Sequence, residues 1–179
     1  MNETIIGNNI LLRPITREDT DLIVKWRRNP LVRQNFIYRG DITRESHLRW
    51  LKEKVDTREV VQFIIEEIVN NNHNPVGSVY FKDIDYNNSS AEYGIFIGED
   101  SARGKGYGTE VAKLFTNYGI NTLGLHRIML RLISTNEIAY KSYLCAGFKI
   151  EGTAREMVKI DGTFKDVIFM SLLAGEEIL

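Results

Sequence analysis

The alternation of apolar and polar residues predicts a chain that mixes short strands with amphipathic helices. Segments with the composition and period of strands are, in chain order, Asn9–Pro14, Val60–Val69, Val76–Asp83, Ala91–Ile97, Arg127–Ile133, Thr153–Ile160 and Thr163–Leu173. Turn residues at Asn70–Pro75 and Tyr86–Ser90 separate the second, third and fourth of these, which predicts an antiparallel meander. Asp161-Gly162 predicts a type I′ hairpin turn between the last two.

Four helices are predicted between these strands. Thr16 and Thr43 are suitable N-cap residues for the first two, and Asn29-Pro30 ends the first. A third helix covers about Tyr107–Tyr118, and a fourth covers Asn136–Ala146. The apolar faces of the first three contain Leu22, Ile23 and Trp26, then Leu48, Leu51 and Val55, then Val111, Leu114, Phe115 and Tyr118. The order β-α-α-β-β-β-α-β-α-β-β predicts a mixed α/β fold.

Composition limits the possible functions. With 179 residues, 43% hydrophobic and 26% charged, the chain fits a single globular domain over residues 1–179. A net charge of −1 gives no reason to expect a nucleic-acid partner, and no apolar run is long enough to predict a membrane span. The three histidines are far apart and no Cys/His cluster has zinc spacing, so no metal is expected.

Cys145 is the only cysteine of the chain. A single thiol cannot form an internal disulfide, so we expect a reducing, cytoplasmic setting. The N-terminal residues lack the pattern of a secretory signal, which agrees with that expectation. The position of Cys145 near the end of a helix predicts burial, and no His or Asp at a telling spacing suggests a nucleophilic role.

The most informative segment is RGKGYG at Arg103–Gly108, between a predicted strand and a predicted helix. Its three glycines allow a tight backbone turn with exposed N–H groups. The following helix adds unpaired N–H donors and the positive end of its dipole, which together suit a pyrophosphate. Arg103 and Lys105 supply positive charge for phosphate oxygens.

Two other glycine-rich nucleotide motifs do not fit this segment. In a Walker loop, Ser or Thr would stand where Gly106 stands, and Gly98 lies one residue too far upstream. A dinucleotide fingerprint would need a third glycine where Thr109 stands, and it would not follow an antiparallel meander. A plain glycine-rich turn without a ligand is the remaining alternative when the loop is considered alone.

A second motif separates these alternatives. Arg103, Gly106 and Gly108 match the [QR]-x-x-G-x-[GA] signature of the GCN5-related N-acetyltransferase (GNAT) family. Downstream, Asn136-Glu-Ile-Ala139, Tyr143 and Gly147-Phe148 resemble the N-x-x-A…Y…GF segment of the same family. The resemblance is tight over about the last half of the chain and extends to the first half in pattern only. The segments KWRRNP at Lys25–Pro30 and ESHLRWL at Glu45–Leu51, with the ending EGTAREMVKIDGTFKDVIFMSLL, resemble the RimJ/RimL-like branch of the family. That branch includes ribosomal-protein N-terminal, spermidine and amino-sugar-nucleotide acetyltransferases.

This resemblance implies a central twisted, splayed and mostly antiparallel sheet flanked by about four helices, with acetyl-CoA in the gap as co-substrate. The residues that would hold it are Phe96, Ile97 and Gly98 on a strand, Arg103, Gly104, Lys105, Gly106, Tyr107, Gly108 and Thr109 in the loop, and Asn136, Ala139 and Tyr143 beyond. It also implies direct transfer of an acetyl group to a primary amine in a ternary complex. An acetyl-CoA-binding sensor without turnover is the non-enzymatic alternative.

The chemistry needs an acid and a base. Tyr143 is the candidate acid for the departing thiolate, although a tyrosine there could simply pack. The amine must lose a proton before it attacks, and Glu92 is the first candidate base. Glu66 and Glu67 on the neighbouring strand are other candidates, and one of these two must point away from the other. His47 is a further candidate because its helix borders the acceptor site in such folds.

The acceptor is predicted only as a class. The first two helices usually shape the acceptor pocket in this family, and Trp26, Arg27 and His47 are the substrate-binding candidates there. Arginines crowd this region, which favours a phosphate-bearing acceptor such as a nucleotide-linked amino sugar, although they could equally be solvated helix charges. A protein N-terminus or a polyamine is the alternative acceptor. The final hairpin could also support a homodimer.

Overall fold

The protein is built on one eight-stranded sheet. The computed structural model describes residues 3–70 and 72–176. The strands lie in the order β1-β2-β3-β4-β5-β6-β8-β7, and every neighbouring pair except β5 and β6 is antiparallel. They are β1 (Ile5–Ile6), β2 (Ile10–Pro14), β3 (Val61–Val69), β4 (Asn72–Asp85), β5 (Ser90–Ile97), β6 (Arg127–Ile133), β7 (Lys149–Ile160) and β8 (Thr163–Leu173).

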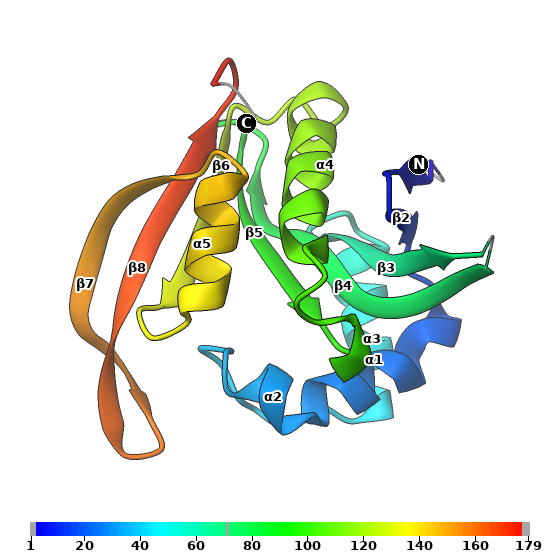
Figure 1. Ribbon diagram of the computed structural model, residues 1–179, viewed down its shortest axis with the longest axis horizontal. Helices are drawn as coiled ribbons and strands as arrows, with labels where there is room; N and C mark the ends of the chain where they lie inside the picture. Colours follow the sequence, from blue (N-terminus) through cyan, green and yellow to red (C-terminus); the bar gives the residue numbers. More distant parts are fainter. Residues whose placement is uncertain (1–2, 71, 177–179) are drawn as a thin grey trace.

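Helices cover both faces of this sheet (Figure 1). The α-helices are α1 (Thr20–Arg28), α2 (Pro30–Arg33), α3 (Arg44–Trp50), α4 (Tyr107–Asn121) and α5 (Glu137–Cys145). Shorter turns are the 3₁₀ segments η1 (Arg17–Asp19) and η3 (Asp100–Ala102), and the π-helical segment η2 (Leu51–Val55), which extends α3. The predicted mixed α/β class and splayed, mostly antiparallel sheet are confirmed.

Several elements differ from the sequence prediction, and the short strand β1 precedes the first predicted strand. The turn predicted at Asn70–Pro75 is wrong from Asn72 onward, because pairing between β3 and β4 continues to Val69 opposite Asn72; residue 71 lies outside the described residues. The last hairpin is longer than predicted, since β7 begins at Lys149. The loop before Thr43 contains the short helix α2, whose first turn is capped by the Asn29 side chain at 2.9 Å from the Leu31 nitrogen.

The predicted start of the second helix and the final turn are confirmed, whereas Thr16 precedes the 3₁₀ turn η1 and α1 begins only at Thr20. The hydroxyl of Thr43 accepts the Ser46 backbone N–H at 3.1 Å, and the Ser46 hydroxyl accepts the Thr43 N–H at 2.9 Å. This reciprocal pair fixes the start of α3. Asp161 and Gly162 both have positive φ, at 48° and 81°, as a type I′ turn requires.

The sheet separates two apolar cores. Residues Phe63, Phe81 and Tyr93 point to the face covered by α4, where Phe81 stacks on Phe115 with ring centroids 4.4 Å apart. Alternate residues on the same strands, including Ile64 and Phe96, belong to a smaller core under α1 and α3 with Ile23, Trp26 and Leu51. The two-residue period of the strands therefore assigns each side chain to one core or the other.

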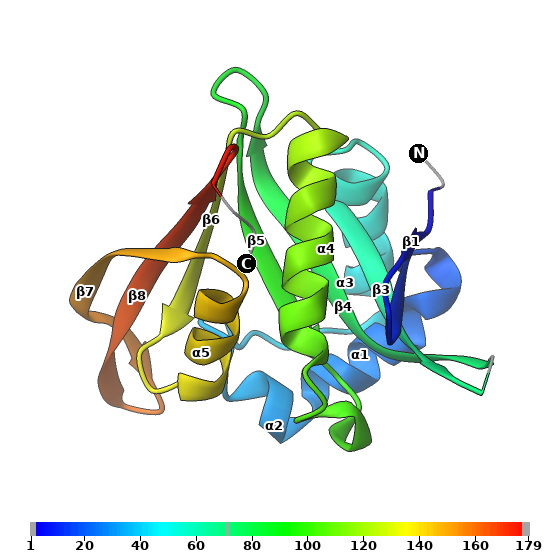
Figure 2. The same ribbon diagram turned by 45° about the horizontal axis from the view of Figure 1, so that its top comes forward.

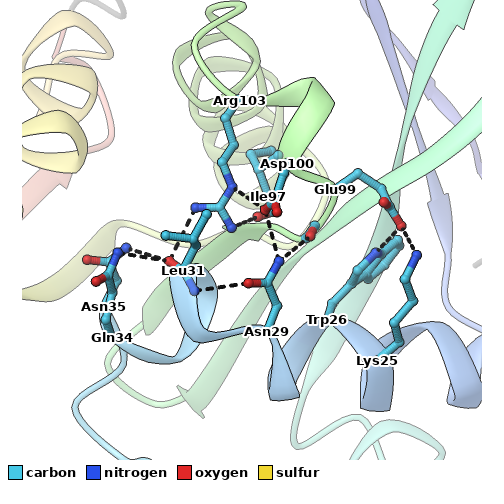
Figure 3. Close-up of polar contacts among 11 residues, drawn as sticks. Lys25, Trp26, Asn29, Leu31, Gln34, Asn35, Ile97, Glu99, Asp100 and Arg103 are labelled. Atoms are coloured by element: carbon cyan, nitrogen blue, oxygen red, sulfur yellow. Dashed lines mark hydrogen bonds and ion pairs between the residues drawn. The ribbon is translucent and has the colours of Figure 1, made fainter.

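Trp26 anchors α1 to the end of β5. Its side chain is 0% exposed, and its indole ring lies so close to Gly98 that a Cβ at residue 98 would overlap the ring. The indole N–H donates to Glu99 Oε1 at 2.7 Å, and the Lys25 ammonium reaches the same oxygen at 2.6 Å (Figure 3). Gly98 is thus required by close packing.

We predict that Gly98→Ala destabilises the fold by about 1–3 kcal/mol, because the new methyl group must displace the buried indole of Trp26. Urea unfolding measures the change. Gly152→Ala is the matched control, since a Cβ at this strand glycine would meet nothing within 4 Å, and it should shift stability by less than about 0.5 kcal/mol. Equal effects of the two substitutions would contradict the packing role of Gly98.

Candidate active site

The parallel strands β5 and β6 touch at one end only. Ser90–Glu92 pair with Arg127–Met129, and beyond these residues β5 pairs with β4 alone and β6 with β8 alone. Figure 2 shows the two strands diverging, with α5 beside the opening. A cavity of about 980 Å³ lies here, lined by β5, the glycine-rich loop, α5 and the segments from α1 to α3.

Most of the predicted site residues meet around this cavity. The lining includes Arg27, His47, Glu92, Phe96, Ile97, Arg103, Gly104, Gly106, Tyr107, Gly108, Thr109, Asn136, Ala139 and Tyr143. Trp26, Gly98 and Lys105 are not part of it. The two motifs that lie far apart in the sequence are therefore brought to one site.

The glycine-rich loop presents backbone donors to the cavity. Gly104 and Gly106 have φ of 73° and 81°, a region that glycine adopts without strain. Gly106 is the N-cap of α4, and the first helical bonds come from the Thr109 and Glu110 nitrogens to its carbonyl at 3.1 and 3.2 Å. The N–H groups before Thr109 thus have no acceptor within the helix, and the helix dipole adds positive potential there. This arrangement fits a pyrophosphate.

The charged side chains of the loop are already engaged. The Arg103 guanidinium donates to the carbonyls of Leu31 at 3.2 Å and Ile97 at 3.1 Å, which ties the loop to α2 and to the end of β5 (Figure 3). The Lys105 ammonium contacts Glu67 at 3.0 Å. Arg103 therefore stabilises the position of the loop, and the backbone N–H groups remain available to donate hydrogen bonds to an anion.

The free edge of β5 offers backbone groups to the gap. The Gly98 N–H donates to the Val76 carbonyl at 2.7 Å, so it points toward β4. Backbone groups alternate in direction along a strand, which places those of Phe96 toward β4 and those of Ile95 and Ile97 toward the gap. The Ile97 carbonyl is used by Arg103. Ile95, which the sequence did not single out, thus joins Ile97 at this edge.

α5 brings Asn136 and Tyr143 to the opposite wall. The Asn136 side chain caps α5 by accepting the Ala139 N–H at 3.3 Å, so the predicted capping role is present at a cavity-lining residue. Tyr143 packs edge-on against Tyr93 and Phe148 with centroids 6.0 and 5.7 Å apart. Burial raises the pKa of Tyr143 above its ordinary value, with a smaller contribution from Tyr80. Its phenol therefore stays protonated and able to donate.

Glu92 is held by two cations. Its carboxylate contacts the Lys82 ammonium at 3.2 Å and the Arg131 guanidinium at 2.8 Å, and Arg131 also donates to its other oxygen at 3.1 Å. Glu92 is therefore not a freely solvated strand residue, and its side chain is only 14% exposed. Lys82 lies opposite Glu92 on β4, and Arg131 lies on the diverging part of β6, so the three side chains connect the strands beside the opening.

Two residues of the first helices line the acceptor side. The Arg27 guanidinium lies 3.7 Å from the Phe36 ring centroid. His47 is 3% exposed, and its Nδ1 lies 3.2 Å from the Thr20 hydroxyl. Burial lowers the pKa of His47, Arg27 lowers it further, and Asp19 acts in the opposite direction. His47 is therefore a buried residue whose surroundings favour the neutral imidazole.

Two other predicted residues have different places from those expected. Trp26 does not line the cavity, because its ring is used to pack on Gly98. Cys145 was expected to be buried, and this is wrong: it is exposed and lies at the cavity lining. At the end of α5, the side chain of Ala146 is buried in the core, and the side chain of Cys145 is not.

Glu66 and Glu67 point to opposite faces, as expected for adjacent strand residues. Glu66 accepts from Arg13 at 2.7 Å, and Glu67 accepts from Lys105 and from the Tyr107 hydroxyl. Neither lines the cavity.

Tyr80, Lys82 and Arg131 also line the cavity, and the sequence analysis did not name them. The predicted meander implied that Tyr80 pairs with Gly94 and Lys82 with Glu92, but these pairs could be named only once the strand register was known.

The sequence and fold of this chain are similar to those of known proteins. Residues 9–149 match the model of the acetyltransferase (GNAT) domain, which is most of the chain. The chain belongs to the GNAT acetyltransferase family. It is an acetyl-CoA-dependent N-acetyltransferase, as the residues of the resemblance implied.

Relatives of known sequence and structure agree on the family. The chain is 25% identical to the uncharacterized N-acetyltransferase p20 of Bacillus licheniformis, over 97% of this chain and 98% of that one. It is 26% identical to the spermidine N(1)-acetyltransferase of Escherichia coli K12, over 93% and 87%. The Vibrio cholerae spermidine N-acetyltransferase in complex with CoA and spermine has the same fold, with a TM-score of 0.86 at 24% identity over 95% of this GNAT chain and 98% of that chain.

Two further findings concern what this GNAT domain does not contain within its described residues. Residues 3–70 and 72–176 include no helix long and apolar enough to cross a membrane. In the same part of the chain, no three His, Cys, Asp or Glu side chains are grouped so that they could hold a metal ion.

We predict that Gly106→Ala weakens acetyl-CoA binding about tenfold, because an L-residue resists φ of 81° at a cost of about 1–2 kcal/mol and the loop N–H groups turn away. Calorimetric titration measures the dissociation constant. Gly162→Ala is the matched control, since Gly162 has the same φ and equally open space but lies in the last hairpin turn, outside the cavity lining. It should lose similar stability and keep its affinity; equal affinities for the two variants would contradict the role of the loop.

Proposed function

We propose that this enzyme acetylates a small primary amine that carries an anionic group, and that a nucleotide-linked amino sugar is the acceptor class that fits best. The observation that supports this acceptor class is the environment of Arg27. Of the arginines that line the cavity, Arg103 and Arg131 contact carboxylates, whereas Arg27 has no carboxylate partner among the described residues. A half-buried guanidinium facing a cavity suits a phosphate or carboxylate of the ligand.

The charge of the cavity supports this class over a polyamine. Its cationic lining residues are Arg27, Lys82, Arg103, Arg131 and Lys141, and its carboxylates are Asp41 and Glu92. Glu92 is shared by two cations, and the Asp41 side chain is 89% exposed. A polycationic acceptor needs unpaired carboxylates, which this lining does not offer. The similarity to spermidine acetyltransferases favours a polyamine as the second candidate.

The co-substrate is assigned to the groups that remain free. We assign its pyrophosphate to the N–H groups of Gly104–Gly108, and its pantetheine arm to the β5 edge at Ile95 and Ile97 and to Asn136. Acetyl-CoA supplies an acetyl group already activated as a thioester, so the protein's main task is to bring the amine close to it. Arg103 holds the loop in place through Leu31 and Ile97.

Tyr143 is assigned as the acid. Its raised pKa keeps the hydroxyl protonated, and the hydroxyl has no hydrogen-bond partner among residues 3–70 and 72–176. The residue lies on α5 seven residues beyond Asn136, at the lining of the same cavity. A hydroxyl in this state can give its proton to the departing sulfur.

The proposed homodimer through the final hairpin stays a prediction.

We predict that Tyr143→Phe lowers kcat by about 10²-fold or more and leaves the acetyl-CoA dissociation constant within about twofold, because only the proton donor is lost. Thiol release measured with a colorimetric reagent gives kcat, and calorimetry gives the affinity. Tyr140→Phe, on the same helix but outside the cavity lining, should keep full activity. An unchanged kcat in Tyr143→Phe would remove the acid role.

The acceptor class is tested by thiol release with a UDP-linked amino sugar, spermidine and a short peptide with a free N-terminus. We predict turnover with the amino sugar, and a KM for it raised about tenfold or more in Arg27→Gln through loss of a charged hydrogen bond. Arg28→Gln, at an exposed residue outside the lining, is the control and should behave like wild type. Turnover of spermidine alone, unaffected by Arg27→Gln, would replace the proposed acceptor by a polyamine.

A further inference from the structure

Tyr80 lies in the middle of the cavity wall that faces α1 and α3. On β4 its neighbours Val79 and Phe81 belong to the core under α4, so the side chain of Tyr80 points to the opposite face of the sheet. The residues paired with it on both sides, Gln62 on β3 and Gly94 on β5, line the cavity as well. Tyr80 is therefore the central residue of a row that crosses three strands on this face.

Gly94 leaves room for the ring of Tyr80 to reach across β5. A Cβ at residue 94 would lie 2.3 Å from Cζ of Tyr80 and 2.5 Å from its hydroxyl oxygen, so the tip of the ring lies directly over the Gly94 backbone. A side chain at residue 94 would displace this ring. The pair thus carries a hydroxyl group from β4 across to β5, the strand that borders the gap in the sheet.

The Tyr80 hydroxyl is available to a ligand. Tyr80 lines the cavity and is only partly buried, and its hydroxyl has no hydrogen-bond partner among residues 3–70 and 72–176. It also differs from the unpartnered atoms that the protein encloses completely, such as the Tyr93 hydroxyl and Nε2 of His47. A ligand in the cavity can therefore bond to the Tyr80 hydroxyl without first breaking a contact within the protein.

The charged groups around Tyr80 favour an anion beside its hydroxyl. Those that act on it come from four elements, namely Arg27 on α1, Lys82 on β4, Glu92 on β5 and Arg131 on β6. Three of these groups are cations and one is a carboxylate. Partial removal from water raises the pKa of Tyr80, so the hydroxyl keeps its proton at pH 7 and can donate it in a hydrogen bond. An O–H donor among cations suits a phosphate or carboxylate and disfavours an ammonium.

We propose that Tyr80 is a second specificity-determining residue of the acceptor site, whose hydroxyl donates a hydrogen bond to the anionic group that Arg27 binds. The two residues enter the same cavity from β4 and α1, and the Arg27 charge acts on the Tyr80 hydroxyl. This inference rests on the proposed function and adds to it a residue that distinguishes an anionic acceptor from a polyamine. The hydroxyl keeps its proton throughout, so its role is binding.

The first test is calorimetric titration of UDP, used as the anionic probe, into enzyme saturated with CoA so that the co-substrate site is occupied. Tyr80→Phe keeps the ring over Gly94 and removes only the hydroxyl, so we expect it to weaken UDP binding about tenfold. Tyr86→Phe, at an exposed tyrosine outside the lining, is the matched control and should bind UDP like wild type. Equal UDP affinities of wild type and Tyr80→Phe, or no binding of UDP to wild type, would overturn the proposal.

The second test is steady-state kinetics with the UDP-linked amino sugar. We expect Tyr80→Phe to raise its KM about tenfold while kcat and the acetyl-CoA dissociation constant stay within about twofold, a split that a folding defect would not produce. In the double variant with Arg27→Gln, KM should rise by less than the product of the two single effects, because both residues bind one anion. An unchanged KM in Tyr80→Phe, or effects that simply multiply, would contradict the shared anion site.

These measurements separate the inference from the function on which it rests. Turnover of spermidine alone in the acceptor panel would refute the proposed acceptor class. The UDP titration needs no turnover, so it still decides whether the Tyr80 hydroxyl binds an anion. Turnover of the amino sugar with a wild-type KM in Tyr80→Phe would leave the proposed function standing and remove the role of Tyr80.

Discussion

The incomplete pairing of β5 with β6 is the constraint on which the rest of the site depends. Three residues on each strand pair at one end, and the remaining length of β5 keeps a free backbone edge. A free edge inside a protein has unpaired N–H and C=O groups that would be costly without a partner. Under the proposed assignment, the pantetheine arm of the co-substrate is that partner, and the gap would be a binding surface as well as a break in the sheet. The Lys82–Glu92–Arg131 contacts beside it hold the diverging strands together by charge.

The two faces of the sheet also differ in the groups that they present. On the α4 face, aromatic rings such as Phe81 and Phe115 pack into the larger core, and the α4 N-terminus provides anion donors. On the α1 and α3 face, a smaller core around Trp26 carries the polar groups of the acceptor side. The cavity joins both faces because the strands separate there. A co-substrate and an acceptor can then approach the same point from opposite sides, which direct transfer in a ternary complex requires.

The resemblance named the residues on the loop and α5 side of the cavity more completely than those on the α1 and α3 side. The glycine-rich loop and the Asn136–Tyr143 segment are continuous motifs that carry the family resemblance, so most of their cavity-lining residues could be named in advance. The other half of the cavity is assembled from Arg27, His47, Tyr80, Lys82 and Arg131, which come from four different elements. Their meeting depends on strand register and helix packing, which no local pattern encodes. Trp26 illustrates the limit, because only its contact with Gly98 shows that it is structural.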